Sequence, residues 1–512
     1  MRRGSGRPAP LDGTPLLHPG RRRPRGAAAA VLTPFQPAAG RRHAPLDSPA
    51  LPAARDPMSP LARPPALPAP RPRDPAGARS RWWLALYLAA VTLPLLALLP
   101  AADQSGAGFG WDFAMALGYA SAALFGVQFA LTARFKRATV PFGIDLVYRF
   151  HRHLAVAALA LLVLHVVLVY ATVPAMAGSH DPRLAPPHMT AGRLAIVCCV
   201  LAVVLSLARQ PLRLPYEAWH ITHTLLATAG FALALAHVFG AGRYLDTPWK
   251  QALWVAYGGF CLSLIVWLRA VRPWRLARVP WRVTRVQAER GRVTTLQLAA
   301  PAGRPLRFEP GQFVWLSLAR SPWRMQEHPF SIASAAGTRD TIELSIKALG
   351  DFSSAVSSVQ PGTRAWVDGP YGTFGIDQHP DAPGYAFVAG GVGCAPVLSM
   401  LRTLAERADR RPLALFYGNR RWERVAFREE LDALASRLDL RVVHVLQEPP
   451  LEWRGEHGLI TRDVLARHLP GGYTAWHWFV CGPTPMTRLV ERHLADLDVP
   501  ARQVHSEIFD WV

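Results

Sequence analysis

Long apolar runs dominate the first half of the chain from Trp82 onward. Six such segments lie near residues 82–100, 111–133, 150–173, 191–208, 216–240 and 249–268. Each is close to the roughly 20 residues that a helix needs to cross a bilayer. The pattern therefore predicts a bundle of six transmembrane helices over residues 81–272.

The pattern changes after Arg275 to short runs such as VTTLQLA, FVWLSL and TIELSIKA, separated by glycine and proline. Such runs are typical of β-strands. The segments FVAGGVGCAP (387–396) and FVCGPTPM (479–486) read instead as a strand, a turn and the start of a helix. Gly391 and Gly393 let backbone amides approach a pyrophosphate, and Pro396 suits the first turn of the following helix. The second half is therefore predicted to be a soluble α/β part that binds a nucleotide.

The charge pattern orients the helices and sets the N-terminal segment apart. Arginine and lysine are concentrated before the first apolar run, between the second and third, and after the fourth and sixth. By the positive-inside rule both termini face the cytoplasm. Residues 1–81 carry 15 Arg, no Lys and 4 Asp among many Pro and Ala, and so supply +11 of the net charge of +22. We predict a disordered cytoplasmic tail over 1–80 that lies near lipid headgroups and does not bind nucleic acid.

Four histidines stand in equivalent places on the third and fifth segments. The interval from His151 to His165 equals that from His223 to His237. In a helix such an interval is about 40° short of four full turns and rises about 21 Å. Each helix thus presents two imidazoles on one face, which predicts two stacked bis-histidine sites for two b-type haems. His151 pairs with His223 on the cytoplasmic side, and His165 with His237 on the outer side. The alternatives are pore-lining histidines or the ligands of a six-helix metal transporter with a regulatory nucleotide-binding domain.

Further motifs follow in a fixed order: HPFSIAS (328–334), LSIKALGDFS (344–353) and VDGPYG (367–372), then the two strand–turn–helix segments. With the paired histidines, this series resembles the NADPH oxidase and ferric reductase superfamily over roughly residues 80–512. The resemblance implies a six-helix ferric-reductase-like haem domain (81–272), an antiparallel β-barrel FAD domain (274–380) and a Rossmann-like NAD(P) domain (381–512). It also implies a multi-pass protein of a bacterial inner membrane.

The resemblance assigns roles to individual residues. Pro329, Phe330 and Ser331 would line the isoalloxazine of FAD. The FAD diphosphate would be met by His328, Lys347 and the amides of Gly350, Asp351, Phe352 and Ser353. Gly391 and Gly393 would take the pyrophosphate of the nicotinamide dinucleotide. Cys481, Gly482 and Pro483 would lie by the nicotinamide. Phe509 would cover the flavin, with Trp511 as the rival for that place.

These parts together imply an NAD(P)H-dependent flavohaem oxidoreductase. Electrons would pass from cytoplasmic NAD(P)H through FAD and two haems to an extracytoplasmic acceptor. The acceptor stays open between oxygen, giving superoxide, a ferric chelate, and a periplasmic partner protein. Arg420 and Arg421 stand where a 2′-phosphate would be met, and residues 417–422 contain no acid. We therefore expect NADPH to be preferred over NADH.

Overall fold

The computed structural model describes residues 75–99, 108–134, 144–318, 321–469 and 471–508. All of the described residues belong to one compact unit, Pro72–Val512. The predicted tail over residues 1–80 therefore lies almost entirely outside the described residues.

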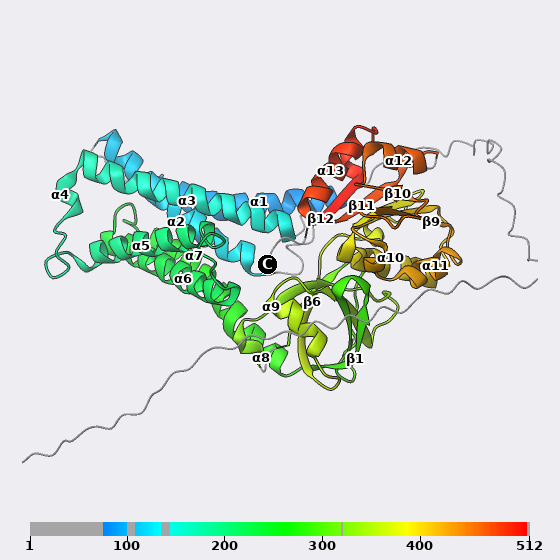
Figure 1. The fold of residues 1–512 in the computed structure, drawn as a ribbon. Helices are drawn as coiled ribbons and strands as arrows, with labels where there is room; N and C mark the ends of the chain where they lie inside the picture. The colour runs from blue at the N-terminus through cyan, green and yellow to red at the C-terminus, as the bar shows by residue number, and fades with distance from the viewer. Residues whose placement is uncertain (1–74, 100–107, 135–143, 319–320, 470, 509–512) are drawn as a thin grey trace, which may run out of the picture. The chain divides into compact units, whose positions relative to one another are not determined.

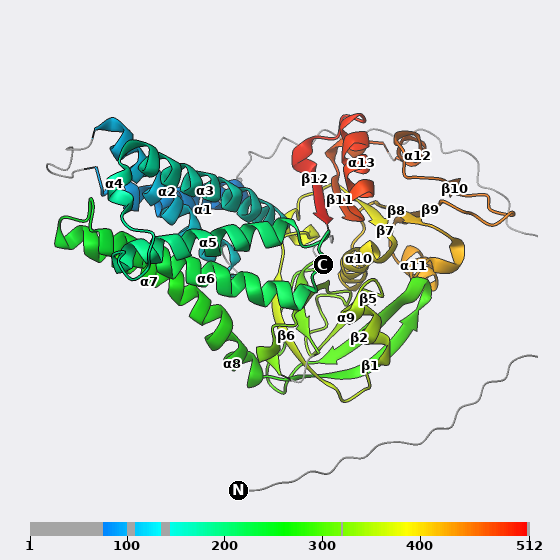
Figure 2. The same ribbon diagram turned by 60° about the vertical axis from the view of Figure 1, so that its left-hand side comes forward.

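Six long helices are described in the first half of the chain, and in both views α2, α3, α5, α6 and α7 run side by side (Figure 1, Figure 2). They are α1 (Pro75–Leu96), α2 (Phe109–Thr132), α3 (Ile144–Thr172), α5 (Pro187–Leu207), α6 (Tyr216–Ala241) and α7 (Pro248–Val266). A short helix, α4 (Pro174–Ala177), follows α3. Among the described residues, five helices are long and apolar enough to cross a membrane, and all five fall on predicted segments.

The first predicted segment, 82–100, is where the structure and the prediction differ. The apolar part of α1 covers Arg81–Leu96, which is shorter than a full span. Helix α1 ends at Leu96, shortly after Pro94. Proline lacks the backbone N–H that continues a helix, so an apolar run through it need not stay helical. Five candidate spans are thus found among the described residues, and the sixth remains a prediction.

Large apolar side chains cover the outer surface of the bundle. Leu88 on α1, Leu225 on α6 and Val255 on α7 are 57%, 65% and 58% exposed. A water-soluble helix would turn such residues inward. Their outward position fits a hydrocarbon surrounding, so the chain is a multi-pass membrane protein.

Helix α7 does not stop at the predicted boundary near residue 272. It continues through a π-helical turn (Trp267–Val271) into α8 (Arg272–Ala277). The first strand of the next part begins at Trp281. The link between the membrane helices and the strands is therefore mostly helical and short.

Residues 281–371 form one six-stranded sheet that closes on itself. Its strands are β1 (Trp281–Glu289), β2 (Val293–Ala299), β3 (Phe313–Ser317), β4 (His328–Ser331), β5 (Thr341–Lys347) and β6 (Arg364–Tyr371). They lie in the order β4-β3-β6-β1-β2-β5, and every paired neighbour is antiparallel. An antiparallel bridge between Ile332 and Leu344 joins the two ends of this order. The closed sheet agrees with the predicted β-barrel and encloses its own core of aliphatic side chains.

The C-terminal domain is a parallel sheet with helices on both faces, and its strands and helices are labelled in Figure 2. Its strands are β7 (Tyr385–Gly390), β8 (Leu413–Asn419), β9 (Leu440–Leu446), β10 (Glu456–His457), β11 (His477–Gly482) and β12 (Val504–Ile508). The order is β10-β9-β8-β7-β11-β12. Core residues of α10 (Cys394–Glu406) and α11 (Arg428–Ala435) pack on one face, and those of α12 (Arg462–His468) and α13 (Thr484–Ala495) on the other.

The strand order reverses between β7 and β11, because the chain first builds the sheet on one side of β7 and then on the other. In open α/β sheets, ligands bind outside the carboxyl ends of the strands at such a point. Both predicted strand–turn–helix segments end there, since β7 leads into Gly391–Gly393 and β11 into Pro483. The fold thus brings the two nucleotide motifs to one edge of the sheet.

Candidate functional site

The four predicted histidines lie on α3 and α6 and form two pairs, one above the other. The rings of His151 and His223 have centres 6.3 Å apart, with planes at 79°. Two metal–imidazole bonds of about 2 Å, plus about 1 Å from each nitrogen to its ring centre, sum to about 6 Å. The separation of this pair therefore fits one metal ion between the two rings.

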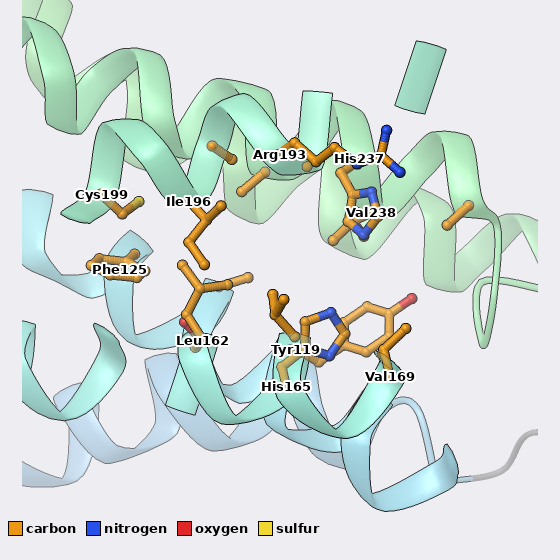
Figure 3. Close-up of a pocket in the computed structure, with 18 of the residues that line it drawn as sticks. Tyr119, Phe125, Leu162, His165, Val169, Arg193, Ile196, Cys199, His237 and Val238 are labelled. Atoms are coloured by element: carbon orange, nitrogen blue, oxygen red, sulfur yellow. The ribbon is translucent and has the colours of Figure 1, made fainter. Parts of the chain in front are cut away.

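The second pair, His165 and His237, lines one apolar pocket from opposite sides (Figure 3). The Nδ1 atom of His165 lies 2.7 Å from the carbonyl oxygen of Ala114, and that of His237 lies 2.9 Å from the carbonyl oxygen of His188. A carbonyl oxygen can only accept, so each Nδ1 must carry the hydrogen. The Nε2 lone pair of each ring is then the one available for a metal, which is the usual arrangement of a metal-binding histidine.

Glycines make room for these two rings. A Cβ atom on Gly118 of α2 would lie 2.9 Å from Nδ1 of His165, and one on Gly192 of α5 would lie 2.7 Å from Nδ1 of His237. Sequence reasoning missed both residues. The available signal is a glycine inside an apolar helix, which weakens the helix and calls for a packing reason.

In the pair formed by His151 and His223, only one of the two rings has hydrogen-bond partners at Nδ1 among the described residues. Nδ1 of His223 lies 3.0 Å from the hydroxyl of Ser206 and 3.3 Å from the carbonyl oxygen of Ala202. Nδ1 of His151 is buried and has no hydrogen-bond partner among the described residues. The other two histidines of these helices lie outside both pairs. His220 contacts Arg269, with 2.8 Å between Nε2 and Nη2, and His153 is exposed. The structure thus groups the four histidines that spacing selects, and the donor set fits two haems.

The HPFS motif forms β4 and places polar atoms where no protein partner meets them in the described part of the chain. Ser331 is buried, and its hydroxyl has no hydrogen-bond partner there. His328 is also buried and stacks on Phe352, with ring centres 4.0 Å apart. Burial lowers the pKa of His328. Phe330 lies against the same Phe352 ring at 5.9 Å. A buried, unsatisfied hydroxyl and stacked aromatic rings on one strand fit a flavin, because the hydroxyl needs a polar partner and the rings need flat apolar cover.

The loop after β5 is less open than the sequence suggested. The hydroxyl of Ser353 accepts hydrogen bonds from the amides of Leu349 and Gly350, at 3.0 and 2.9 Å. The amide of Gly350 is therefore engaged within the loop. Asp351, Phe352 and Ser353 open the short helix α9 (Asp351–Ala355).

Lys347 at the end of β5 reaches toward the nucleotide turn. A Cβ atom on Gly391 would lie 3.5 Å from its Nζ atom. The predicted place of Lys347 was by the FAD diphosphate, whereas the structure puts its ammonium group beside the turn predicted for the nicotinamide dinucleotide. Partial burial, together with Arg424 and Arg292, lowers the pKa of Lys347. A cation in this place is suited to a diphosphate.

The two glycine-containing turns pack backbone against backbone. Gly391 has a φ of +55°, which glycine adopts without strain, and its carbonyl oxygen accepts a hydrogen bond of 3.1 Å from the hydroxyl of Tyr417. A Cβ atom on Gly393 would collide with the carbonyl group of Cys481. A Cβ atom on Gly482 would lie 3.1 Å from the amide nitrogen of Gly390. Larger residues at these positions would force the ends of β7 and β11 apart.

Other predicted residues are placed as follows. Pro396 lies in the first turn of α10, and Pro483 caps α13. The thiol of Cys481 is fully buried, and burial, with Glu507 and Cys394 nearby, raises its pKa well above the usual value. A thiol of this kind packs and does not act as a nucleophile. Phe509 and Trp511 lie outside the described residues.

Arg420 and Arg421 are exposed at the end of β8, and both pair with one carboxylate. Their Nε atoms each lie 2.6 Å from an oxygen of Glu448. Glu448 follows β9 and is distant from both arginines in sequence, so the sequence pattern did not predict this contact. A 2′-phosphate would have to share these arginines with Glu448.

Three family descriptions match separate parts of the chain. A ferric reductase like transmembrane component matches residues 117–236, an FAD-binding domain matches 279–374, and an oxidoreductase NAD-binding domain matches 387–492. These matches follow the membrane bundle, the closed sheet and the parallel sheet in order.

Individual proteins resemble the second half of the chain. Ferredoxin--NADP reductase B of Sorangium cellulosum is 34% identical over 227 residues, which cover 43% of this chain and 92% of that protein. An NADH-cytochrome b5 reductase-like protein of Emericella nidulans is 30% identical over 185 residues, which cover 35% of this chain and 39% of that protein. The flavohem-like FAD/NAD-binding domain of nitric oxide dioxygenase from Vibrio cholerae is 21% identical, with a TM-score of 0.41, and the match covers 45% of this chain and 98% of that domain.

The three family matches and the ferredoxin reductase relative account for each domain in turn. The chain is an oxidoreductase that belongs to the ferric reductase and NADPH oxidase type of proteins, in which a ferric reductase-like transmembrane component is joined to FAD-binding and NAD-binding domains.

Proposed function

We propose that this protein takes electrons from NAD(P)H on the cytoplasmic side and delivers them across the membrane to a small acceptor on the outside. The acceptor is oxygen, which gives superoxide, or a ferric chelate. The site is that of a flavohaem enzyme with FAD and two b-type haems. Both termini face the cytoplasm, and the protein resides in the inner membrane of a bacterial cell.

The observation that carries this proposal is the arrangement of His165 and His237. Each directs its Nδ1 hydrogen at a backbone carbonyl, and each faces a glycine that clears space for its ring. His151 and His223 supply a second pair on the same two helices. When bound, FAD accepts a hydride and releases electrons one at a time, and haem iron passes single electrons onward.

The soluble residues supply binding and orientation. The turn at Gly391 and Gly393 would receive the diphosphate of NAD(P)H, and Lys347 would offset its charge. Ser331 would hydrogen-bond the polar edge of the flavin, with Pro329 and Phe330 along the ring. Phe509 would cover the flavin until nicotinamide displaces it, and Trp511 is the rival for that role.

The experiment begins with the full-length protein in detergent or nanodiscs. A difference spectrum with NADPH as reductant, compared with dithionite, reports whether haem is present and reducible by nucleotide. Turnover is then measured with NADPH in air, with superoxide detected directly, and with ferric citrate under anaerobic conditions.

We expect a b-type haem spectrum that NADPH reduces fully and a measurable rate with one of the two acceptors. A protein that binds FAD but shows no haem spectrum after supplementation with haemin would contradict the proposal. That result would favour the interpretation of these histidines as ligands of a transported metal.

A further inference from the structure

Three histidines that none of the predicted motifs uses meet at one point of the C-terminal domain. His379 follows a short 3-10 turn (Ile376–Gln378), His477 opens β11, and His505 lies in β12. One ring nitrogen from each residue lies within 4.8 Å of the other two. Within the described ranges, no other group of three His, Cys, Asp or Glu residues meets this condition.

The three rings are already in contact. His379 stacks on His477 and on His505, with ring centres 4.0 and 4.2 Å apart. The rings of His477 and His505 lie in nearly parallel planes, and Nδ1 of His477 shares a hydrogen bond of 2.9 Å with Nε2 of His505. In a tetrahedral site with metal–nitrogen bonds of about 2 Å, ligand nitrogens are about 3.3 Å apart. The observed separations, from 2.9 Å to at most 4.8 Å, bracket this value.

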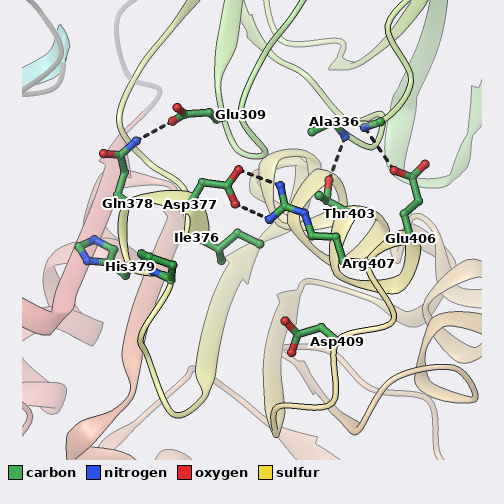
Figure 4. A network of polar contacts seen from close by, with 12 residues as sticks. Glu309, Ala336, Ile376, Asp377, Gln378, His379, Thr403, Glu406, Arg407 and Asp409 are labelled. Atoms are coloured by element: carbon green, nitrogen blue, oxygen red, sulfur yellow. Dashed lines mark hydrogen bonds and ion pairs between the residues drawn. The ribbon is translucent and has the colours of Figure 1, made fainter.

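The segment that carries His379 is held in place on both sides. Asp377 accepts two hydrogen bonds from Arg407, at 2.5 and 2.8 Å, and Gln378 donates one of 2.6 Å to Glu309 (Figure 4). The hydroxyl of Tyr385 donates to the carbonyl oxygen of His379 at 2.8 Å. The chain thus presents His379 to the two strands without having to order a free loop, which lowers the entropic cost of binding a ligand.

The cluster is separate from the nucleotide edge of the sheet. His477 is the first residue of β11, whereas Gly482 at the nucleotide turn is the last. A strand of this length spans about 16 Å. The histidines therefore lie at the amino ends of the parallel strands, and the predicted cofactor residues lie at the carboxyl ends.

We propose that His379, His477 and His505 bind a divalent transition-metal ion of the zinc class, with water completing the coordination. Three imidazoles and one solvent position are a ligand set that zinc accepts. The metal would take the place of the hydrogen that His477 and His505 now share, and that hydrogen would move to the other nitrogen of its own ring. It would tie the segment between the barrel and β7 to the two last strands, and so brace the domain without taking part in electron transfer. This site goes beyond the proposed function and does not depend on it.

The histidines of the cluster are uncharged near neutral pH. Desolvation by burial, with the neighbouring imidazoles, lowers the pKa of His379 to about 4 and that of His505 to about 3. Neutral imidazole is the form that binds metals.

The test uses the untagged full-length protein, stripped with EDTA and dialysed against ZnCl2 at a series of free concentrations. Bound zinc per chain is measured by elemental analysis. The variants are His477→Gln and His505→Gln, and the matched control is His457→Gln, an exposed histidine on β10. We expect wild type and control to bind one zinc ion more than either cluster variant, or to bind it more than about tenfold more tightly.

A second measurement needs no variant. Amide hydrogen exchange is followed in wild type with and without ZnCl2, and zinc should slow exchange at residues 376–382 and 504–506. Equal zinc in wild type and both cluster variants, or unchanged exchange in these segments at saturating zinc, would overturn the proposal. In that case the three rings are a packing cluster held by stacking and one hydrogen bond.

Discussion

Glycine serves opposite purposes in the two halves of this protein. In the membrane bundle, Gly118 and Gly192 leave space that imidazole rings fill. At the edge of the parallel sheet, Gly393 leaves space that the backbone of Cys481 and Gly482 fills. A ring at the end of a side chain can shift when a methyl group is added, but two packed strand ends cannot. The same Gly→Ala change should therefore alter a bound group in the membrane half and the fold itself in the soluble half.

The largest effect should come from His237→Ala, which removes a proposed haem ligand from the pair that we place toward the outer side. Reduction of the extracytoplasmic acceptor should fall more than about a hundredfold, because losing a direct ligand costs more than losing its supporting partner. Reduction of a cytoplasmic dye by NADPH should stay within twofold, since the soluble domains are untouched. The two rates are measured on the same folded preparation.

His153→Ala is the matched control, because His153 is exposed on the same helix as His165 and outside both pairs. It should retain both rates. If His237→Ala loses both rates while its FAD content is unchanged, the order from soluble domains to membrane pairs is wrong.

The next effect in size is that of Gly393→Ala. Its added methyl group would meet backbone atoms of Cys481 and Gly482, including the Cys481 carbonyl carbon at 2.7 Å. Overpacking of this kind costs about 1–3 kcal/mol, and each kcal/mol lowers Tm by about 3–6 °C for a domain of intermediate size. Thermal unfolding and the KM for NADPH are the measurements, and both should change.

Gly118→Ala gives the contrasting case, because its nearest atoms belong to the side chain of His165. It should change the haem spectrum and leave the melting of the soluble domains unaltered. Equal loss of stability in both variants would remove the distinction between the two kinds of glycine.

Local features of the two halves could be predicted from the sequence, but the exact ends of helices could not. Helix geometry is local, so an interval of nearly four helical turns was enough to put two histidines on one face of each helix. The charge pattern of the loops then predicted the pairing of His151 with His223 and of His165 with His237. The strand–turn–helix motifs were also readable, because glycine and proline mark turns wherever they occur. The end of α1 was harder to predict, because apolar composition alone does not show that a helix containing Pro94 ends at Leu96.

Contacts between distant segments could not be read from the pattern. Gly118 and Gly192 matter through histidines that lie on other helices, far away along the chain. Glu448 reaches Arg420 and Arg421 from the end of another strand, and Ser353 takes the amide of Gly350 that was expected to face a ligand. Each depends on helix packing, strand order or loop closure, which a single sequence with ordinary local patterns leaves open.

Lys347→Ala should have a moderate effect on cofactor binding. It distinguishes a lysine that binds the diphosphate of NADPH from one that binds the diphosphate of FAD. If its ammonium group meets NADPH at the Gly391 turn, the KM for NADPH should rise about tenfold, as expected for a charge-assisted contact that is partly solvated. The FAD content should be unchanged. Loss of FAD with an unchanged KM would instead place Lys347 at the flavin diphosphate.

The lowered pKa of Lys347 adds a pH test of the same contact. Protonated lysine binds the diphosphate and neutral lysine does not, so affinity should fall as pH rises through the pKa. Because that pKa is depressed, the KM for NADPH should begin to rise at a pH below the ordinary lysine value of about 10.4. In Lys347→Arg this rise should disappear, because arginine stays charged.

The smallest effect concerns the choice between NADPH and NADH. Arg420 and Arg421 are offered to solvent but pair with Glu448, and their hydrogen bonds lower the pKa of that carboxyl, so it stays ionised. We expect NADPH to be preferred, mainly through KM, because a remote phosphate is bound equally in the ground and transition states. The preference should be modest, since Glu448 competes with the phosphate for the same guanidinium groups.

Glu448→Gln should therefore raise the ratio of kcat/KM for NADPH over NADH about two- to fivefold, the size of an exposed charge pair. Arg420→Ala/Arg421→Ala should bring the ratio close to one, while Arg454→Ala, at an exposed arginine that forms no ion pair with Glu448 among the described residues, should leave it unchanged. If neither the Glu448 variant nor the double arginine variant changes the ratio, the arginines do not bind the 2′-phosphate and pair only with Glu448.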